Sequence, residues 1–339
     1  MSGQAAKPKI FIDYIAYARS IGKPVKHIAD DTIVGTRDGV FTQNPSKTNI
    51  IERTSTTVTL ILRLEEDVQD LEFAKLVQSV NYVAMLNHNM YDCGFNNFFL
   101  TGLTSNNTSQ DYVGLSGTET YGSPSLNGFI LWQDFNNGIS PLGSYGISMM
   151  MVGAADIDPP LSIGSVSIGR SFSFPHNANL SMKISYNNHG IKRSRTSGGS
   201  DIVNINYSKQ PDWDGRPPFV ATNASGLSAT SYVGSRSWDL TFSYLSPDNT
   251  FPQNMGEDFI FDNVFDDNGN PVSWTNHTTD NITSHFMALT CNGQIPFIFQ
   301  PDDTKNTFAM CRLRSKSFSV EQAAPNLYTC KMTFDEVVV

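Results

Sequence analysis

Apolar and polar residues alternate along three long segments of the chain. Residues 58–64, 238–244 and 328–334 each place an apolar side chain at every second position. Successive side chains of a strand point to opposite faces, so this period of two predicts strands with one face on a core and the other toward solvent or a partner. Shorter strands are expected at residues 81–86, 129–132, 144–151, 164–174, 180–186, 191–195 and 202–207. The chain is therefore predicted to be mainly β.

A strong turn signal separates two of these shorter strands. Residues 187–190 read Asn-Asn-His-Gly, and Asn and Gly tolerate the backbone conformations of tight turns. We therefore expect residues 180–186 and 191–195 to form a hairpin.

Two segments carry a helical pattern. Residues 67–75 place Val68 and Leu71 at helical spacing. Residues 280–289 begin with a capping residue and space their apolar side chains along one side, and the pattern ends before Gly293. The second segment is the one helix expected in the C-terminal half.

The stretch that follows this helix, residues 292–302, reads NGQIPFIFQPD. Gly293 is suited to a left-handed helix cap, and Pro296 stands at the start of the run, where a missing N–H does least harm. Because Ile298 faces the side opposite to Phe297 and Phe299, both faces of the strand are apolar. The stretch is predicted to be a buried core strand rather than the wall of a pocket.

Composition and charge narrow the classes of function. The chain has 339 residues, a net charge of -9 and 16% charged residues. An acidic chain is a poor match for nucleic acid as the main partner, and the charged fraction is too low for a disordered protein. No apolar run reaches the length of a membrane span, and the N-terminal residues lack the pattern of a secretory signal. We expect no direct nucleic-acid binding and no membrane insertion.

The residue patterns of common enzymes and metal sites are missing from the sequence. There is no G-x-S-x-G, no phosphate-binding loop and no H-E-x-x-H, so no catalytic residue and no cofactor is predicted. Residues 262–270 resemble a calcium loop only in part, because carboxylates are lacking at both ends, and a tight turn is the better interpretation. The four cysteines form no C-x-x-C pair and are expected to be reduced thiols.

Two features are candidates for contacts with a partner or a glycan. Lys192, Arg193 and Arg195 concentrate positive charge, which suits an acidic surface or a phosphate, or a strand face in solvent or against a neighbouring subunit. Trp213 lies in a loop rich in turn residues, where it would stack on a sugar or a protein partner or anchor its own loop.

Residues 80–90, VNYVAMLNHNM, resemble the "NYVAILGHNL" strand of galactose-binding-like (discoidin-type) jelly rolls found in phage virion proteins. Residues 161–170, LSIGSVSIGR, resemble the closing strand of such modules. This chain has Asn87 where the family usually has Gly. His88 and Asn89 are interpreted as residues that fix the next loop by hydrogen bonds, with ligand contact as the alternative.

The C-terminal half resembles uncharacterised proteins in the structural gene clusters of tailed phages. The resemblance rests on FPHNANLS at 174–181, RSWDLTFSYL at 236–245, IPFIFQPD at 295–302 and the last strand at 326–336. This order is similar to the ring-forming β-domain of tail-tube and distal-tail proteins. The resemblance implies an N-terminal arm at 1–30, a jelly-roll-like β-sandwich at 31–175 and a ring-forming β-domain at 176–339.

The resemblance implies a non-enzymatic structural protein of a virion tail, made in the host cytoplasm and assembled as a ring with other tail proteins. Val337, Val338 and Val339 are then expected to be buried against a neighbouring subunit. The alternative is a carbohydrate-binding protein for adhesion to a host surface glycan, with an aromatic site on the loops at 104–125 or 132–140. A glycan depolymerase is a third hypothesis, which no motif supports.

Overall fold

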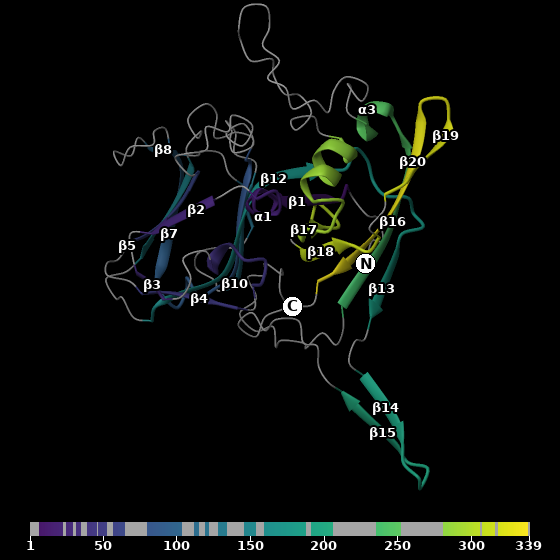
Figure 1. Cartoon of the computed structure of the whole chain (residues 1–339), viewed down its shortest axis with the longest axis horizontal. Coiled ribbons are helices and arrows are strands. Elements are labelled where there is room, and N and C mark those ends of the chain that lie inside the picture. The colour runs from purple at the N-terminus through teal and green to yellow at the C-terminus, as the bar shows by residue number, and fades with distance from the viewer. Residues whose placement is uncertain are drawn as a thin grey trace, which may run out of the picture.

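The structure is a computed structural model, and it is mainly β, as the alternation of residues predicts (Figure 1). All strand pairs among the described residues are antiparallel. The described residues are 7–22, 25–29, 32–34, 39–45, 47–52, 57–64, 80–103, 112–114, 119–121, 128–133, 146–153, 159–187, 191–205, 235–251, 281–305, 307–315 and 318–337. The expected helix at 67–75 lies outside them.

The first half of the chain forms two facing sheets. One is five-stranded, in the order β2 (Val25–Ala29), β5 (Thr57–Leu64), β11 (Gly146–Gly153), β7 (Phe95–Leu103) and β8 (Tyr112–Gly114). The other contains β12 (Leu161–Ser173), β6 (Tyr82–His88), β10 (Gly128–Gln133) and β9 (Glu119–Tyr121), with β4 (Asn49–Glu52) and β3 (Thr32–Val34) alongside. Leu60 and Met149 from the first sheet share one core with Met85 and Ile130 from the second.

The second half extends the same large sheet. Its strands are β13 (Lys183–Asn187), β16 (Ser235–Leu245), β20 (Leu327–Glu336), β18 (Ala309–Leu313) and β17 (Phe297–Gln300), and β19 (Val320–Ala324) pairs with β20. The short helix α3 (Pro247–Thr250) follows β16. The helix η2 (Ile282–Met287) covers the sheet, where Phe286 lies 5.3 Å from Phe297 and 5.9 Å from Phe334 between ring centroids.

Strand β1 (Lys9–Asp13) joins the two halves. It pairs with β12 on one side and with β17 on the other, so the 13-stranded sheet runs across the predicted boundary at 175. The expected N-terminal arm thus contains a strand from the middle of the sheet. At Gly169, a Cβ atom would lie 1.9 Å from the carbonyl oxygen of Ile12, so the close approach of β12 to β1 requires glycine.

Side chains of β1 are buried on both faces of the sheet. Ile10 and Ile12 belong to the core shared with the sandwich. Phe11 lies in a second cluster with Tyr82, Ala84, Leu86, Phe129, Leu131, Ile298, Phe308 and Met310, which we call the junction core. The ring of Phe11 packs edge-on against Tyr82 at 5.2 Å between centroids. The junction core therefore fastens β17 and β18 to the outer face of the sandwich.

The structure confirms the prediction for NGQIPFIFQPD. All four residues of β17 are buried, with Phe297 and Phe299 in the main core and Ile298 in the junction core. Ile298 is covered by residues of its own chain. Gly293 has a φ of +72°, but it is not the helix cap that the sequence predicts. The cap is Cys291, with a φ of +50°, because the N–H groups of Cys291 and Asn292 donate to the Ala288 and Met287 carbonyls. A Cβ at Gly293 would lie 2.4 Å from the Cβ of Leu313.

The helix expected at 280–289 is present, with an N-terminal part wider than an α-helix. Asn281 caps it, since its Oδ1 accepts a hydrogen bond from the Ser284 N–H at 2.7 Å. The helix begins with a π-type segment over Ile282–Met287, and Ile282, Phe286 and Leu289 are fully buried. The sequence shows the cap and the apolar spacing but carries no signal for the wider turn.

The predicted hairpin between residues 180–186 and 191–195 is wrong. Strand β13 pairs with β16, whereas β14 (Ile191–Arg195) pairs with β15 (Asp201–Ile205). The hairpin turn lies at 196–200, where Gly199 has a φ of +86° and the Thr196 hydroxyl accepts a hydrogen bond from the Ser200 N–H at 3.0 Å. A turn signal marks where the chain bends but does not fix which strands pair.

Helix α1 (Tyr14–Ser20) starts directly after β1 and is capped by a buried carboxyl group. Asp13 Oδ1 accepts hydrogen bonds from the backbone N–H groups of Ile15 at 2.9 Å and Ala16 at 3.1 Å. Burial raises the pKa of Asp13 from 3.8 to about 6, because desolvation outweighs these bonds.

The raised pKa of Asp13 predicts a pH-dependent stability. The folded protein binds this proton more tightly than the unfolded chain, so the stabilisation is complete below about pH 4 and is lost as pH rises through about 6. Asn caps a helix without a charge. We expect Asp13→Asn to raise the melting temperature at pH 7 and to change it little at pH 4.

Differential scanning fluorimetry from pH 4 to pH 7 measures this difference. The exposed Asp303→Asn is the control for the same change of carboxyl to amide at the surface. An Asp13→Asn difference that stays constant over the range would contradict the prediction.

Candidate assembly surface

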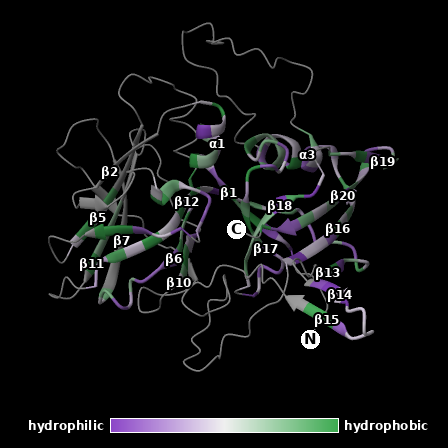
Figure 2. Cartoon of the chain, turned by 60° about the horizontal axis from the view of Figure 1, so that its bottom comes forward, coloured by the Kyte–Doolittle hydropathy of each residue, from purple (hydrophilic) through white to green (hydrophobic). Residues whose placement is uncertain are grey.

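The hairpin of β14 and β15, which we call the ribbon, stands apart from the rest of the fold. Among the described strands, its two strands pair only with each other, and the ribbon projects away from the body (Figure 1). Hydrophilic and hydrophobic residues lie side by side on it (Figure 2). A two-stranded hairpin on its own is marginally stable in water, so the ribbon has little intrinsic support.

The three predicted contact residues of β14 are all exposed on the ribbon. Arg193 Nη2 lies 2.5 Å from Asp201 Oδ2, and the side chains are 71% and 44% exposed, so solvent screens this ion pair. Arg195 Nε donates to the Gly199 carbonyl at 3.2 Å. Lys192 is also exposed. The structure thus brings these cations together on one projecting element.

Apolar side chains share the ribbon with these cations. Val203 stands opposite Arg193 in the strand register, and Ile202 stands opposite Ser194. Ile202 and Val203 are 51% and 55% exposed. Ile202 and Val203 are neighbours in one strand, so one exposed apolar side chain lies on each face of the ribbon.

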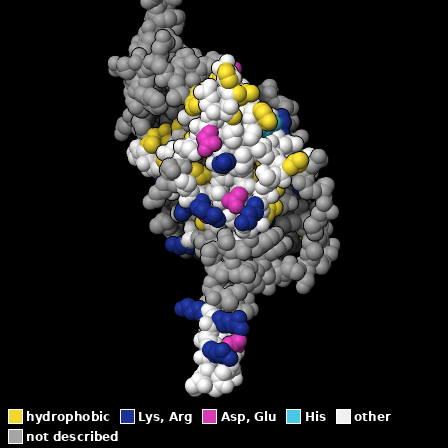
Figure 3. Space-filling view, turned by 90° about the vertical axis from the view of Figure 1, so that its right-hand side faces the viewer, with side chains coloured by type: hydrophobic (Ala, Val, Ile, Leu, Met, Phe, Trp, Pro, Cys, Tyr) yellow, Lys and Arg dark blue, Asp and Glu magenta, His cyan; other side chains and the backbone are white. Residues whose placement is uncertain are grey.

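A second group of exposed apolar residues lies at the edge of the large sheet. Among the described residues, five of the eight exposed large hydrophobic side chains fall between positions 180 and 244. Besides the two on the ribbon, they are Leu180, Ile184 and Tyr244, which we call the edge patch. Figure 3 shows hydrophobic side chains spread over this side of the molecule, with Lys and Arg below them and on the ribbon.

Local hydrogen bonds fix the edge patch on the outer strands. Asn179 N–H donates to the Thr241 carbonyl at 2.8 Å, and Asn179 Nδ2 donates to the Ser243 hydroxyl at 2.9 Å. These bonds tie the segment before β13 to the end of β16. Leu180, the next residue, is 89% exposed.

Tyr244 departs from the alternation of buried and exposed residues expected for 238–244. Trp238, Leu240 and Phe242 are buried as predicted, but Tyr244 is 78% exposed and has a φ of +64°. The pairing of β16 with β20 shifts register between Phe242 and Leu245, so Leu245 takes the buried position instead. An aromatic residue rarely adopts a positive φ, and such strain often accompanies function.

A buried ion pair holds β16 against the last strand. Glu336 accepts hydrogen bonds from Arg236 Nη2 at 2.8 Å, from Arg236 Nε at 3.0 Å and from the Arg236 backbone N–H at 2.9 Å. The Arg236 guanidinium also lies 5.0 Å from the ring centre of Trp238. This pairing is bidentate and shielded from water, which fixes the geometry of the edge.

The structural interpretation of His88 and Asn89 is confirmed. Met90 N–H donates to His88 Nδ1 at 3.4 Å, and Asn89 Oδ1 accepts from Ser162 N–H at 2.7 Å. Burial lowers the pKa of His88 to about 3, so its ring is neutral near pH 7. Asn87 has a φ of +55°, a conformation that Gly and Asn tolerate.

The remaining predicted contact residues are only partly described. Trp213, Val338 and Val339 lie outside the described residues, as do most of the loops at 104–125 and 132–140. Val337 is half-buried, and its N–H donates to the Met310 carbonyl at 2.8 Å. Val337 therefore continues the chain along β18, and the burial of 338 and 339 against another subunit stays a prediction.

The described part of the chain offers little reactive chemistry. All four cysteines are free thiols, and burial raises the pKa of Cys330 to about 12 and that of Cys311 well above its usual value. Within the described ranges, no group of three or more His, Cys, Asp and Glu residues could hold a metal ion. No helix in those ranges is both long and apolar enough to span a bilayer.

The Arg236–Glu336 pair predicts a large cost for removing its carboxylate. Glu336→Gln leaves the Arg236 charge in a site where its side chain is only 19% exposed, so we expect a loss of about 3 kcal/mol in the free energy of unfolding. The adjacent Asp335→Asn removes the exposed pair with Arg314 and should cost less than about 1 kcal/mol. Urea denaturation of both variants tests the contrast, and equal losses would refute the structural role of Glu336.

Comparisons of the chain with family models, with curated proteins and with solved structures found no match.

Proposed function

We propose that the chain is a non-enzymatic structural protein of a tailed-phage virion. It is a component of the distal tail or baseplate and assembles into a ring by contacts between β-sheets of neighbouring subunits. The second half of the chain makes the ring, and the sandwich decorates it. Its partners are further copies of itself and other tail proteins.

The edge patch is the observation that supports this proposal most. Single exposed apolar residues are common on soluble proteins, but here three of them fall on or just before β13 and at the end of β16, the last two described strands at one end of the large sheet. Strand β13 ends the sheet, and an unprotected edge is a site where another chain can add. A contact with a neighbouring subunit that runs along β13 to the end of β16 would cover Leu180, Ile184 and Tyr244.

The rigidity of the region also favours an assembly role. The Arg236–Glu336 pair and the stacked rings of Phe174 and Phe242, 4.3 Å apart, fix β16 before any partner arrives. A pre-ordered surface loses less conformational entropy on binding, so a modest contact area can be sufficient.

Assembly of the purified chain tests the proposal. We expect mass photometry to show discrete species of several subunits, and negative-stain images to show rings. Leu180→Glu with Ile184→Glu should shift the protein to monomers, because buried, unpaired carboxylates would oppose the contact. The melting temperature should stay within a few degrees, since both residues are exposed.

The matched control is Ile21→Glu with Ile50→Glu, which changes two exposed isoleucines outside the edge patch. This control should assemble like the wild type. Monomers of the wild-type chain at every concentration, or equal assembly of both double variants, would count against the proposal.

A further inference from the structure

We propose that the β14–β15 ribbon is an assembly arm that docks on a second copy of this chain. The inference rests on the proposed function in one respect, namely that copies of the chain meet in an assembly. Beyond the proposed function, the inference names the ribbon as the element that makes one of the contacts, and it names the chemistry of the surface on which the ribbon docks.

The ribbon lacks the support that a free-standing hairpin needs. It has no third strand and no helix packed on it among the described residues, and Ile202 and Val203 stay exposed. Hairpins gain stability from a third strand or from a packed apolar face. Ile202 and Val203 point to opposite faces of the ribbon, so a partner docked on one face would supply that support and remove one of the two side chains from water.

The opposite net charges of the ribbon and of the rest of the chain favour a second copy of the chain as the partner. Residues 191–205 hold Lys192, Arg193 and Arg195 against Asp201, which gives +3 − 1 = +2. The whole chain carries -9, so the remainder carries -9 − 2 = -11. The ribbon is therefore attracted to the rest of another copy, and opposite charges of this kind guide association and fix its register.

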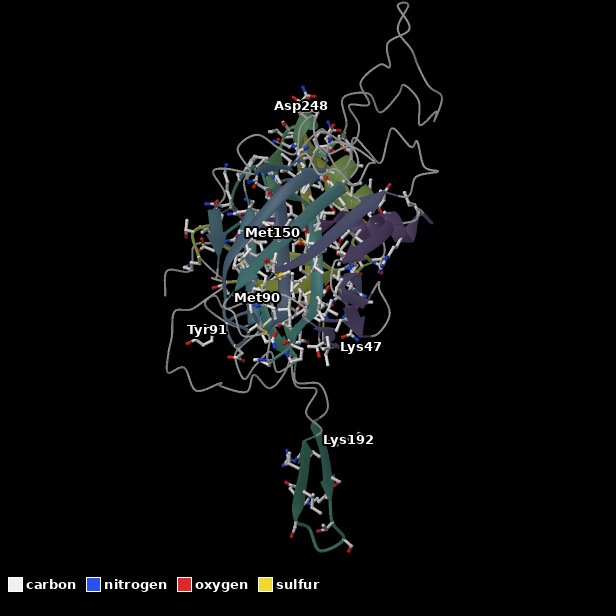
Figure 4. All side chains as sticks on the ribbon, turned by 90° about the vertical axis from the view of Figure 1, so that its left-hand side faces the viewer. Lys47, Met90, Tyr91, Met150, Lys192 and Asp248 are labelled. Atoms are coloured by element: carbon white, nitrogen blue, oxygen red, sulfur yellow. The ribbon has the colours of Figure 1, made fainter. Side chains whose placement is uncertain are left out.

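The end of the molecule opposite the ribbon is a suitable receiving surface. Figure 4 places Asp248 at one end and Lys192 at the other. Asp248 and Glu321 are exposed on α3 and β19. The ring of Phe251, just after α3, packs 5.1 Å from that of Tyr328 on β20, the strand that pairs with β19. A basic arm at one end and these two exposed carboxylates at the other would give a head-to-tail contact, which builds closed rings or stacks rather than isolated dimers.

Photo-crosslinking tests the arm directly. The photoreactive residue p-benzoylphenylalanine replaces Ile202 in the full chain, and an equal mixture of light and ¹⁵N-labelled protein identifies crosslinks between copies by mass spectrometry. We expect mixed-isotope crosslinks from position 202 to peptides of α3 or β19. The same substitution at Tyr91, which is 58% exposed on the sandwich, should give at least tenfold fewer.

Charge reversal provides the second readout. Lys192→Glu with Arg195→Glu should reduce the crosslinks at least tenfold, and so should raising the salt from 0.05 M to 0.5 M, because salt screens exposed charges. Lys7→Glu with Lys47→Glu makes the same change in net charge at exposed sites outside the ribbon and should leave the crosslinks intact. Unchanged melting temperatures show that the variants fold.

The possible results distinguish a failure of the proposed arm from a failure of the proposed function. If the wild-type chain assembles but position 202 crosslinks only within its own chain, or if charge reversal in the ribbon has no more effect than the control, the arm is refuted and the structural role stands. If the wild-type chain stays monomeric at low salt, both are refuted.

Discussion

Burial of β1 on both faces is the constraint on which the rest of the fold depends. Ile10 and Ile12 enter the main core and Phe11 enters the junction core, and each fully buried side chain of this size is worth about 1.5–3 kcal/mol. The same strand supplies backbone hydrogen bonds to β12 and β17. A short N-terminal segment thus makes one continuous sheet from two halves that the sequence suggests are separate domains.

The continuous sheet matters for the proposed function because it distinguishes the packed body of the protein from the ribbon that projects from it. The sandwich, the junction core and the strands β17, β18, β20 and β16 of the large sheet form a single packed body. The ion pair between Arg236 and Glu336 holds β16 against β20 near the edge of this body. The edge patch lies on that body, whereas the ribbon extends beyond it. A rigid edge suits a contact of defined geometry, and a projecting basic arm suits a contact that reaches an acidic neighbour.

In this chain, short sequence patterns predict individual strands and helices. They do not predict strand pairing or register, which depend on contacts between distant segments. The alternation at 328–334 and the cap at Asn281 are properties of short segments, and the structure confirms the strand and the helix. The pairing of β13 with β16, the shift that exposes Tyr244 and the central place of β1 depend on segments far apart in the chain. Of the assembly surface, sequence indicates the ribbon cations but not the edge patch, since Leu180 and Tyr244 resemble ordinary core residues.

Hydrogen–deuterium exchange of the assembled and the dispersed protein tests the central claim most directly. The account predicts that peptides covering 180–205 and 235–245 gain protection on assembly, while β1 and β6 are protected equally in both states because they are already buried. Protection gained only in the sandwich strands, or none in either of those two regions, would contradict it.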